Sequence, residues 1–158
     1  MAATTLEQVL HGRDTISSKD AKVTVTIDGN VINLIDCKEL KINIKKNKEK
    51  VQVLGDHWTK HKTTSVDGTG TLGQYVINSN WLKYGIPYTM KVGDLYFTIT
   101  FTIDDPTSHA GKQIIQLDEV NLDEIPIADF KADDTVMDIS ADFTFEGIHL
   151  VQPFDGIQ

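Results

Sequence analysis

The sequence contains very little cysteine, because Cys37 is the only one among 158 residues. No intrachain disulfide can form, and a small secreted domain held by disulfides is excluded. A reducing compartment such as the bacterial cytoplasm fits this composition. Cys37 lies between a strand end and a lysine-rich segment with no motif around it, which favours a packing residue over a nucleophile.

Long apolar runs and an excess of positive charge are also missing. No run approaches the roughly 20 residues that span a bilayer, and "MAATTLEQVL" lacks the basic start and apolar core of a signal peptide. The 15 Lys and Arg against 23 Asp and Glu give a net charge of -8. This balance argues against a protein that binds nucleic acid through its phosphates, and against a membrane protein.

What the sequence does have is a strong division of charge. Residues 1–62 carry 11 Lys and Arg against 8 Asp and Glu, whereas 63–158 carry 4 against 15. Such polarity suits head-to-tail contacts between copies, although both sets of charges could simply be solvated. The length and the 40% apolar content predict a single domain spanning 1–158, in which 1–20 and 147–158 read as tails.

Apolar residues recur mostly with period two, which predicts a mainly β protein. In "KVTVTIDGNVINLI", Val23, Val25 and Ile27 alternate with polar residues, and 28–30 supplies a hairpin turn before a second strand from Val31. Further strands are predicted in "CKELKINIKKNKEKVQVL", "TGTLGQYVIN", "DLYFTITFTIDD", "KQIIQLDEVNL" and "DTVMDISADFTFEGI". Only "SNWLKYGI" has helical spacing, and "TTLEQVLHG" could form one or two helical turns.

No motif in the sequence supports catalysis. His57 and His61 are four residues apart, a spacing that zinc sites use on a helix, but their glycine- and threonine-rich surroundings predict an extended loop over 55–70. "GTGTLG" lacks the Lys-Ser/Thr ending of a phosphate-binding loop, so Gly68, Gly70 and Gly73 are expected to permit turns or close backbone approach. The carboxylate pairs, such as Asp104-Asp105 and Asp118-Glu119, carry no signal of burial. We therefore expect no catalytic residue, no metal and no cofactor.

A longer pattern is more specific. The segment 47–71, which reads "NKEKVQVLGDHWTKHKTTSVDGTGT", together with "FTITFTIDDPTSHAGKQIIQLDEVNLDEIPIADF" and "DISADFTFEGIHL", resembles the tail tube proteins of contractile phages and PBSX-like prophages. The resemblance covers roughly 40–150. It implies an antiparallel β-sandwich or β-barrel tail tube fold with one flanking α-helix, in which subunits form hexameric rings that stack head to tail into a tube.

The resemblance makes 55–70 an assembly loop that reaches towards the neighbouring ring. The matching positions, expected to stack rings or shape the loop, are Asn47, Lys48, Val51, Gly55, Thr59, His61, Lys62, Thr63, Thr64, Gly68, Thr69, Gly70 and Thr71. If the later strands form the tube wall, their polar faces line the lumen. These faces offer Tyr96, Thr98, Thr100, Thr102, Asp138, Ser140, Asp142 and Glu146, a surface with net negative charge.

The resemblance also implies partners. They are further copies of the chain, a tail sheath protein, a baseplate or initiator, a tape measure protein, and DNA as non-specifically transported cargo in the virion tail. A tube subunit of a related contractile injection system or of a phage-derived bacteriocin remains an alternative. A monomeric β-sandwich binding module for sugars or peptides is a third, from another class.

Overall fold

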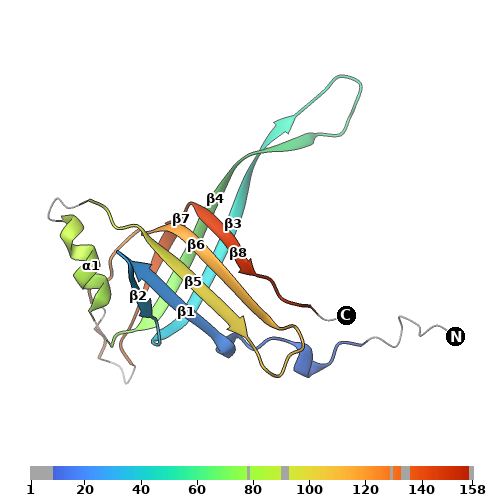
Figure 1. Cartoon of the computed structure of the whole chain (residues 1–158). Helices are drawn as coiled ribbons and strands as arrows, with labels where there is room; N and C mark the ends of the chain where they lie inside the picture. Colours follow the sequence, from blue (N-terminus) through green and yellow to red (C-terminus); the bar gives the residue numbers. More distant parts are fainter. Residues whose placement is uncertain (1–8, 78, 90–92, 129, 133–135, 157–158) are drawn as a thin grey trace.

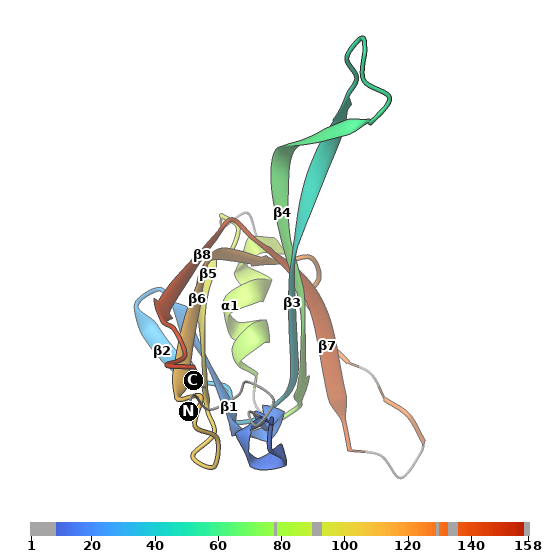
Figure 2. The same ribbon diagram turned by 90° about the vertical axis from the view of Figure 1, so that its right-hand side faces the viewer.

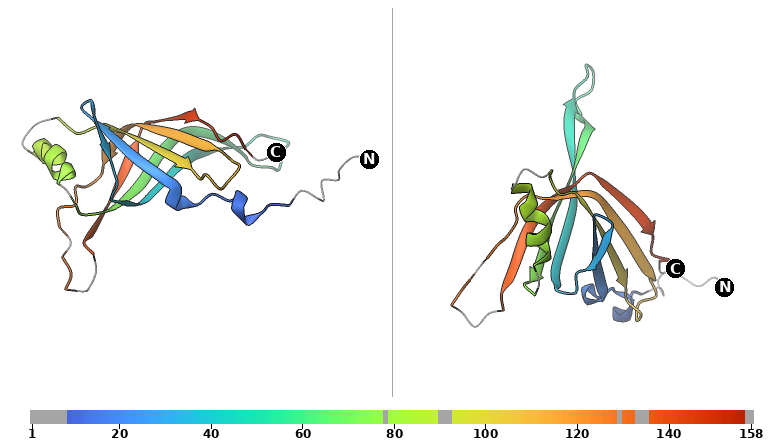
Figure 3. Two further views of the ribbon diagram at one scale, coloured as in Figure 1. Left: turned by 60° about the horizontal axis from the view of Figure 1, so that its bottom comes forward. Right: turned by 60° about the vertical axis from the view of Figure 1, so that its left-hand side comes forward.

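The computed structural model describes residues 9–77, 79–89, 93–128, 130–132 and 136–156. Within them, eight strands form two layers of antiparallel sheet, and one α-helix flanks these layers (Figures 1 and 3). One layer holds β1 (Ala21–Ile27), β2 (Asn30–Asn33), β5 (Phe97–Asp104), β6 (Lys112–Leu122) and β8 (Gly147–Gln152). The other holds β3 (Cys37–Val51), β4 (Lys60–Tyr75) and β7 (Asp138–Phe145). The predicted β-sandwich is confirmed.

Strand β6 joins the two layers. Its first part pairs with β5 and β8, and its last residues, Asn121 and Leu122, pair with Thr144 and Phe143 of β7. The β5–β6 register shifts just before this change, next to Glu119, whose φ of 53° is left-handed. A bulge of this kind bends a strand sharply, which lets β6 leave one sheet for the other.

The predicted N-terminal hairpin is present. Asp28 and Gly29 both have positive φ, 49° and 81°, as the two central residues of a type I′ turn require. The turn pairs Ile27 with Asn30, so β2 begins one residue earlier than the sequence suggests. Val23, Val25 and Ile27 are buried, as their alternation predicts.

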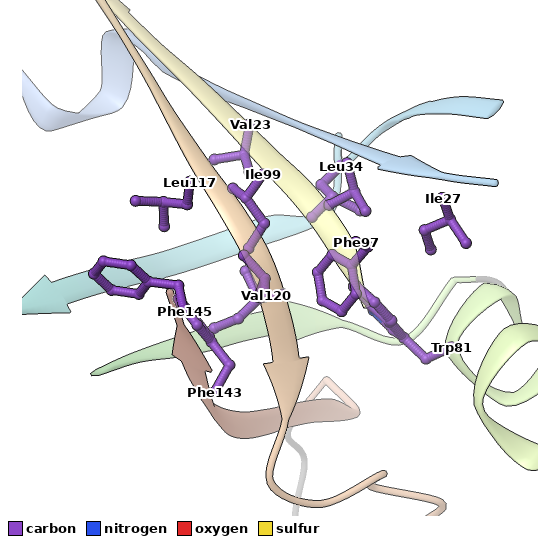
Figure 4. Close-up of a cluster of buried hydrophobic side chains, with 12 residues drawn as sticks. Val23, Ile27, Leu34, Trp81, Phe97, Ile99, Leu117, Val120, Phe143 and Phe145 are labelled. Carbon is purple, nitrogen blue, oxygen red and sulfur yellow. The ribbon is translucent and has the colours of Figure 1, made fainter. Parts of the chain in front are cut away.

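The core lies between the two layers and draws on both (Figure 4). Its largest fully buried side chains come from β1, β5, β6 and β7: Phe143, Ile27, Ile99, Leu117, Val25 and Val120. The alternation predicted for β7 holds from Ser140 onward, because Ala141, Phe143 and Phe145 are buried, whereas Ile139 near its start is only half-buried. In β5 it weakens towards the end, where Phe101 and Ile103 are only half-buried.

The predicted helix is α1 (Asn80–Thr89), which stands at one side of the sandwich (Figures 1 and 2). Its first turn closes through the Lys83 N–H, which donates to the carbonyl of Ser79 at 2.9 Å. Trp81 is buried against Phe97, with ring centroids 5.4 Å apart. This aromatic pair anchors the helix to the core.

The C-terminal tail prediction is wrong, because Gly147–Gln152 forms β8 on the edge of β6. The strand has no alternating signal since none of its residues is buried, and cross-strand pairing alone determines it. At the other end, residues 9–20 contain two short 3-10 turns, Gly12–Asp14 and Ser18–Asp20. The helical turn suggested by "TTLEQVLHG" falls mostly outside the described residues.

The N-terminal segment is fastened to the β5–β6 turn. The Ser17 N–H donates to Asp105 at 3.0 Å, the Ser108 hydroxyl donates to the Asp14 carbonyl at 2.9 Å, and His109 lies 2.9 Å from the Asp14 carboxylate. The hydrogen bond from Ser17, followed by that from Thr107, holds the pKa of Asp105 below its ordinary value. Asp105 therefore has a structural role in a turn.

Candidate assembly surfaces

The most prominent feature is a two-stranded arm formed by the ends of β3 and β4 (Figures 1 and 2). Their pairing runs without other strands from Lys45↔Asp67 to Val51↔Lys60, while β7 accompanies β4 only from Gly68 onward. We call residues 45–67 the arm, and 52–59 its tip. Apart from Asn47, which is half-buried, every arm residue is exposed. The arm lies away from the core that stabilises the sandwich.

The predicted extended loop over 55–70 is wrong for most of its length, because β4 begins at Lys60. Only the tip is a loop. A segment exposed on both faces has no reason to alternate apolar and polar residues, so residues 60–67 show no period-two pattern. Among the residues expected to form the assembly loop, Gly55 and Thr59 lie in the tip and His61, Lys62, Thr63 and Thr64 in β4.

Asn47 fastens the middle of the arm. Its Nδ2 donates to the Ser65 hydroxyl at 3.0 Å and to Asp67 at 2.8 Å, and its carbonyl accepts from Thr64 at 3.2 Å. At this point the register shifts, since Asn47 pairs with Ser65 and Lys48 with Thr63. A bulge redirects a strand pair and increases its twist, so Asn47 and Thr64 together set the direction of the arm.

The tip is held by Asp56. Its carboxylate accepts the Trp58 N–H at 3.0 Å and pairs with Lys60, and the Lys60 bond is the main cause that holds the pKa of Asp56 below its ordinary value. Gly55 has φ 86°, which suits glycine. These contacts present Leu54, fully exposed, and Trp58, 82% exposed, to solvent. Large apolar side chains exposed this far mark a contact surface.

His57 and His61 are exposed in the tip and in β4. Among the described residues, no group of three or more His, Cys, Asp or Glu side chains gathers as a metal site would require. No helix within the described part of the chain is long and apolar enough to cross a membrane.

Gly68 and Gly70 do not shape the loop. They lie inside β4, where it meets β7, and aromatic rings occupy the space that a side chain would need. A methyl group on Gly68 would lie 2.5 Å from the Phe145 ring, and one on Gly70 would lie 2.7 Å from the Lys41 carbonyl and against the Phe143 ring. The close approach expected from these glycines is confirmed, in mid-strand instead of at a strand start.

The residues predicted to line a lumen fall on two different surfaces. Thr98, Thr100 and Thr102 belong to the layer of β5, whereas Asp138 and Asp142 belong to β7 in the other layer, and Glu146 follows β7. Because the inner faces of both layers meet in one core, their outer faces point in opposite directions. The structure therefore does not bring the threonines and the carboxylates together.

The register adds positive charge to the outer face of the β3–β4–β7 layer. Lys41 lies opposite Thr71, and Thr71 opposite Asp142, so the three form one row across the sheet. The Thr71 hydroxyl donates to Asp142 at 2.7 Å, and Asp138 pairs with Lys38, which is the main cause of a lowered pKa for Asp138. The net negative charge expected from β7 alone is thus partly balanced by β3.

Besides the exposed apolar side chains of the tip, the structure has a second apolar surface, which the sequence pattern does not predict. A cavity of about 1410 Å³ separates the start of β3 from β1 and the end of β5, and its lining includes Leu40, Ile42, Phe101 and Ile103. Only the packing of two layers reveals it. The apolar tip could have been found, because Val53, Leu54 and Trp58 lie together in a stretch that is mostly polar.

Solved structures of two contractile machines contain chains with the same fold. A chain of an extracellular contractile injection system, solved as a sheath-tube complex in the extended state, matches with a TM-score of 0.67 over 95% of this chain and 100% of that one, at 10% identity. A chain of the anti-feeding prophage baseplate matches with a TM-score of 0.65 over 96% and 97%, at 11% identity.

The sequence identifies the family more narrowly. The family model described as "Phage tail tube protein" matches residues 8–152, and the chain belongs to this family. It is also 34% identical over 137 residues to the phage-like element PBSX protein XkdM of Bacillus subtilis (strain 168), covering 87% of this chain and 90% of that protein. The protein is accordingly a phage tail tube protein, a structural component of a phage or prophage tail, as the resemblance predicted.

Proposed function

We propose that the chain forms hexameric rings that stack head to tail into the hollow tube of a contractile tail, with the whole chain acting as one structural unit and no catalytic role. The observation that carries this proposal is the pair of open sheet edges in one layer. Within the described residues, β3 pairs only with β4 along its 15 residues, and β7 pairs with β6 only at two positions.

Open strand edges of this length invite pairing with another chain. If the free edge of β3 in one subunit pairs with the free part of β7 in the next, the β3–β4–β7 layers join around the ring into one barrel without edges. Solved neighbours with the same fold include a baseplate treated with 6-fold symmetry and a gene transfer agent tail with C6 symmetry, which supports six subunits. The outer face of this layer then lines the lumen.

The remaining partners follow from this arrangement. DNA passes through the lumen as cargo without sequence-specific contacts, while the β5 side faces a sheath protein. A baseplate or initiator starts the tube, and a tape measure protein inside it sets its length. Assembly takes place in the bacterial cytoplasm, and the product is the virion tail. The arm residues from Asn47 to Thr64 contact the next ring.

A tube subunit of a contractile injection system or bacteriocin is the second candidate, supported by the TM-score to the sheath-tube complex. Negative-stain microscopy of the purified full chain, at high concentration and with tail initiator proteins, tests both. Rings and tubes are expected. Only small monomeric particles under all of these conditions would favour a binding module instead. Tubes found with packaged DNA in induced particles would separate a phage tail from an injection device.

A further inference from the structure

The apolar tip and the apolar cavity lie at opposite ends of the same strand. β3 begins at Cys37, which lines the cavity, and ends at Val51, next to the tip. Its 15 residues span roughly 46 Å at about 3.3 Å per residue. Figure 1 shows β3 rising from the end of the sandwich near the N-terminal 3-10 turns to the arm at the top. A copy shifted along β3 would therefore bring its tip towards the cavity of its neighbour.

The cavity lacks an apolar occupant within the described residues. Leu40 and Ile42 from β3 face Phe101 and Ile103 from β5 across it, and all four are only half-buried. Ile35, at its mouth, is 84% exposed. The same sheet surfaces are fully buried further along, at Ile99 and Phe143. The sandwich is therefore filled at the arm end and open at the other.

The tip has the complementary composition. Leu54 is fully exposed, Trp58 is 82% exposed and Val53 is 49% exposed, on an arm whose other large apolar residues are Val51 and Val66. Asp56 shapes the turn that presents them, because its carboxylate accepts the Trp58 N–H and pairs with Lys60. Tryptophan seated in a desolvated pocket is a frequent source of binding free energy. Lys19 and Lys22, which also line the cavity, form no ion pair among the described residues and can face the carboxylate of Asp56.

We propose that the tip of each subunit, through Leu54 and Trp58, inserts between the two layers of a second copy at the end lined by Ile35, Leu40 and Phe101. This inference rests on the proposed stacking of rings and names the surface that receives the arm. One small contact of this kind is weak, but the copies of one ring engage together, so the effective concentration of each remaining tip is high.

Cys37 makes the proposal directly testable, because this single cysteine lines the cavity. A Leu54→Cys variant that also carries Cys37→Ser is co-assembled with an excess of the wild-type chain, tubes are verified by microscopy, and a mild thiol oxidant such as diamide is added. A disulfide needs Cα atoms within about 7 Å. We expect a covalent dimer on a non-reducing gel, which disappears when the excess chain carries Cys37→Ser.

Matched variants define the other outcomes. Val31→Cys, at a 70% exposed position of β2 outside the cavity, should co-assemble without forming the dimer. Dimer formation by Leu10→Cys instead of Leu54→Cys would assign the cavity to the N-terminal segment and overturn the proposal. Tubes containing Leu54→Cys that never link to Cys37 would overturn it as well, while leaving the stacking of rings intact.

A second variant does not depend on cross-linking. Ile35→Glu places a charge at the mouth of the cavity on an exposed side chain, so the subunit should fold normally while tubes are lost. Val31→Glu is the control and should keep tubes of normal length. Unchanged tubes with Ile35→Glu contradict the inference. If the wild-type chain forms no rings or tubes at all, the proposed function itself fails.

Discussion

The two halves of β4 show what separates the sandwich from the arm. From Gly68 to Tyr75 the strand lies between β3 and β7, with Leu72 and Gln74 buried, whereas from Lys60 to Asp67 it pairs with β3 alone and every residue is exposed. Hydrophobic burial stabilises the first half within one subunit. The second half has only its cross-strand bonds and Asn47, so its order depends on a neighbouring copy.

The largest expected effect on the free energy of unfolding comes from a substitution in the core of the sandwich. Phe143→Ala removes a fully buried ring from the centre of the core and should lower the free energy of unfolding by about 3 to 5 kcal/mol. Leu54→Ala, in the arm, should change it by less than about 0.5 kcal/mol. Urea denaturation of both isolated subunits measures the contrast. Equal losses would mean that the tip is packed in the monomer.

The next effect concerns the junction of the two halves. Gly70→Ala places a methyl group 2.7 Å from the Lys41 carbonyl and against the Phe143 ring, so β3, β4 and β7 must move apart. Overpacking of this kind costs about 1 to 3 kcal/mol. Gly12→Ala, where no atom lies within 4 Å, is the control. Thermal unfolding of the two variants provides the test, and equal midpoints would contradict the close packing of β4 on β7.

The arm itself should change state on assembly. Within the predicted assembly loop of 55–70, amides of 55–67 are expected to exchange rapidly in the isolated subunit and to become protected in tubes. The reason is that fixing each residue costs about 1 to 2 kcal/mol of backbone entropy, which only a neighbouring ring offsets. Amides of 68–75 should be protected in both states. Hydrogen exchange with mass spectrometry measures this, and rapid exchange at the tip of assembled tubes would refute the role of the arm.

Sequence reasoning succeeded where one face of a strand is buried. The strands β1 and β7 could be predicted because burial of one face imposes a period of two on their sequence. The turn could be predicted because its positive φ angles favour the Asp28-Gly29 pair. Sequence reasoning predicted the β3 half of the arm as a strand, but it failed for the β4 half, 60–67, and for β8, where no residue is buried. It also placed Thr98 and Asp142 on one surface, since alternation gives a residue's face within its strand but not the layer to which that strand belongs.

A smaller effect is expected on the pH dependence of amide exchange at the tip. The folded pKa of Asp56 is lowered below its ordinary value of 3.8, mainly by Lys60, so the contribution of this pair to tip order is present above that value and is lost as the pH falls through the lowered folded pKa. In assembled tubes, where the tip is protected, we expect amide exchange at Trp58, corrected for its intrinsic pH dependence, to speed up only at that acidic end. Asp56→Asn should show fast exchange at every pH. A wild-type tip with no such acid dependence would mean that Asp56 does not hold it.

The last expected effect is the smallest on stability and concerns the outer face of the β3–β4–β7 layer below the arm. If this face lines the lumen, its carboxylates repel DNA phosphates over roughly the 8 Å Debye length of physiological salt, which keeps DNA from adhering to the wall. Lys41 already offsets part of that charge from within the row it forms with Thr71 and Asp142. Changing Asp138, Asp142 and Glu146 together to Lys reverses the balance.

The triple variant should still form rings, because all three side chains lie outside the core, although Asp138→Lys also breaks the ion pair with Lys38. Exposed pairs of this kind contribute about 0 to 1 kcal/mol. Genome ejection from tails carrying the variant should be slower than from wild-type tails, and the difference should shrink as salt rises. Changing Thr98, Thr100 and Thr102 to Lys, on the opposite face of the sandwich, is the control and should leave ejection unchanged where tails assemble. Slower ejection with the threonine variant alone would place the lumen on the β5 layer and reverse the orientation of the sandwich in the tube wall.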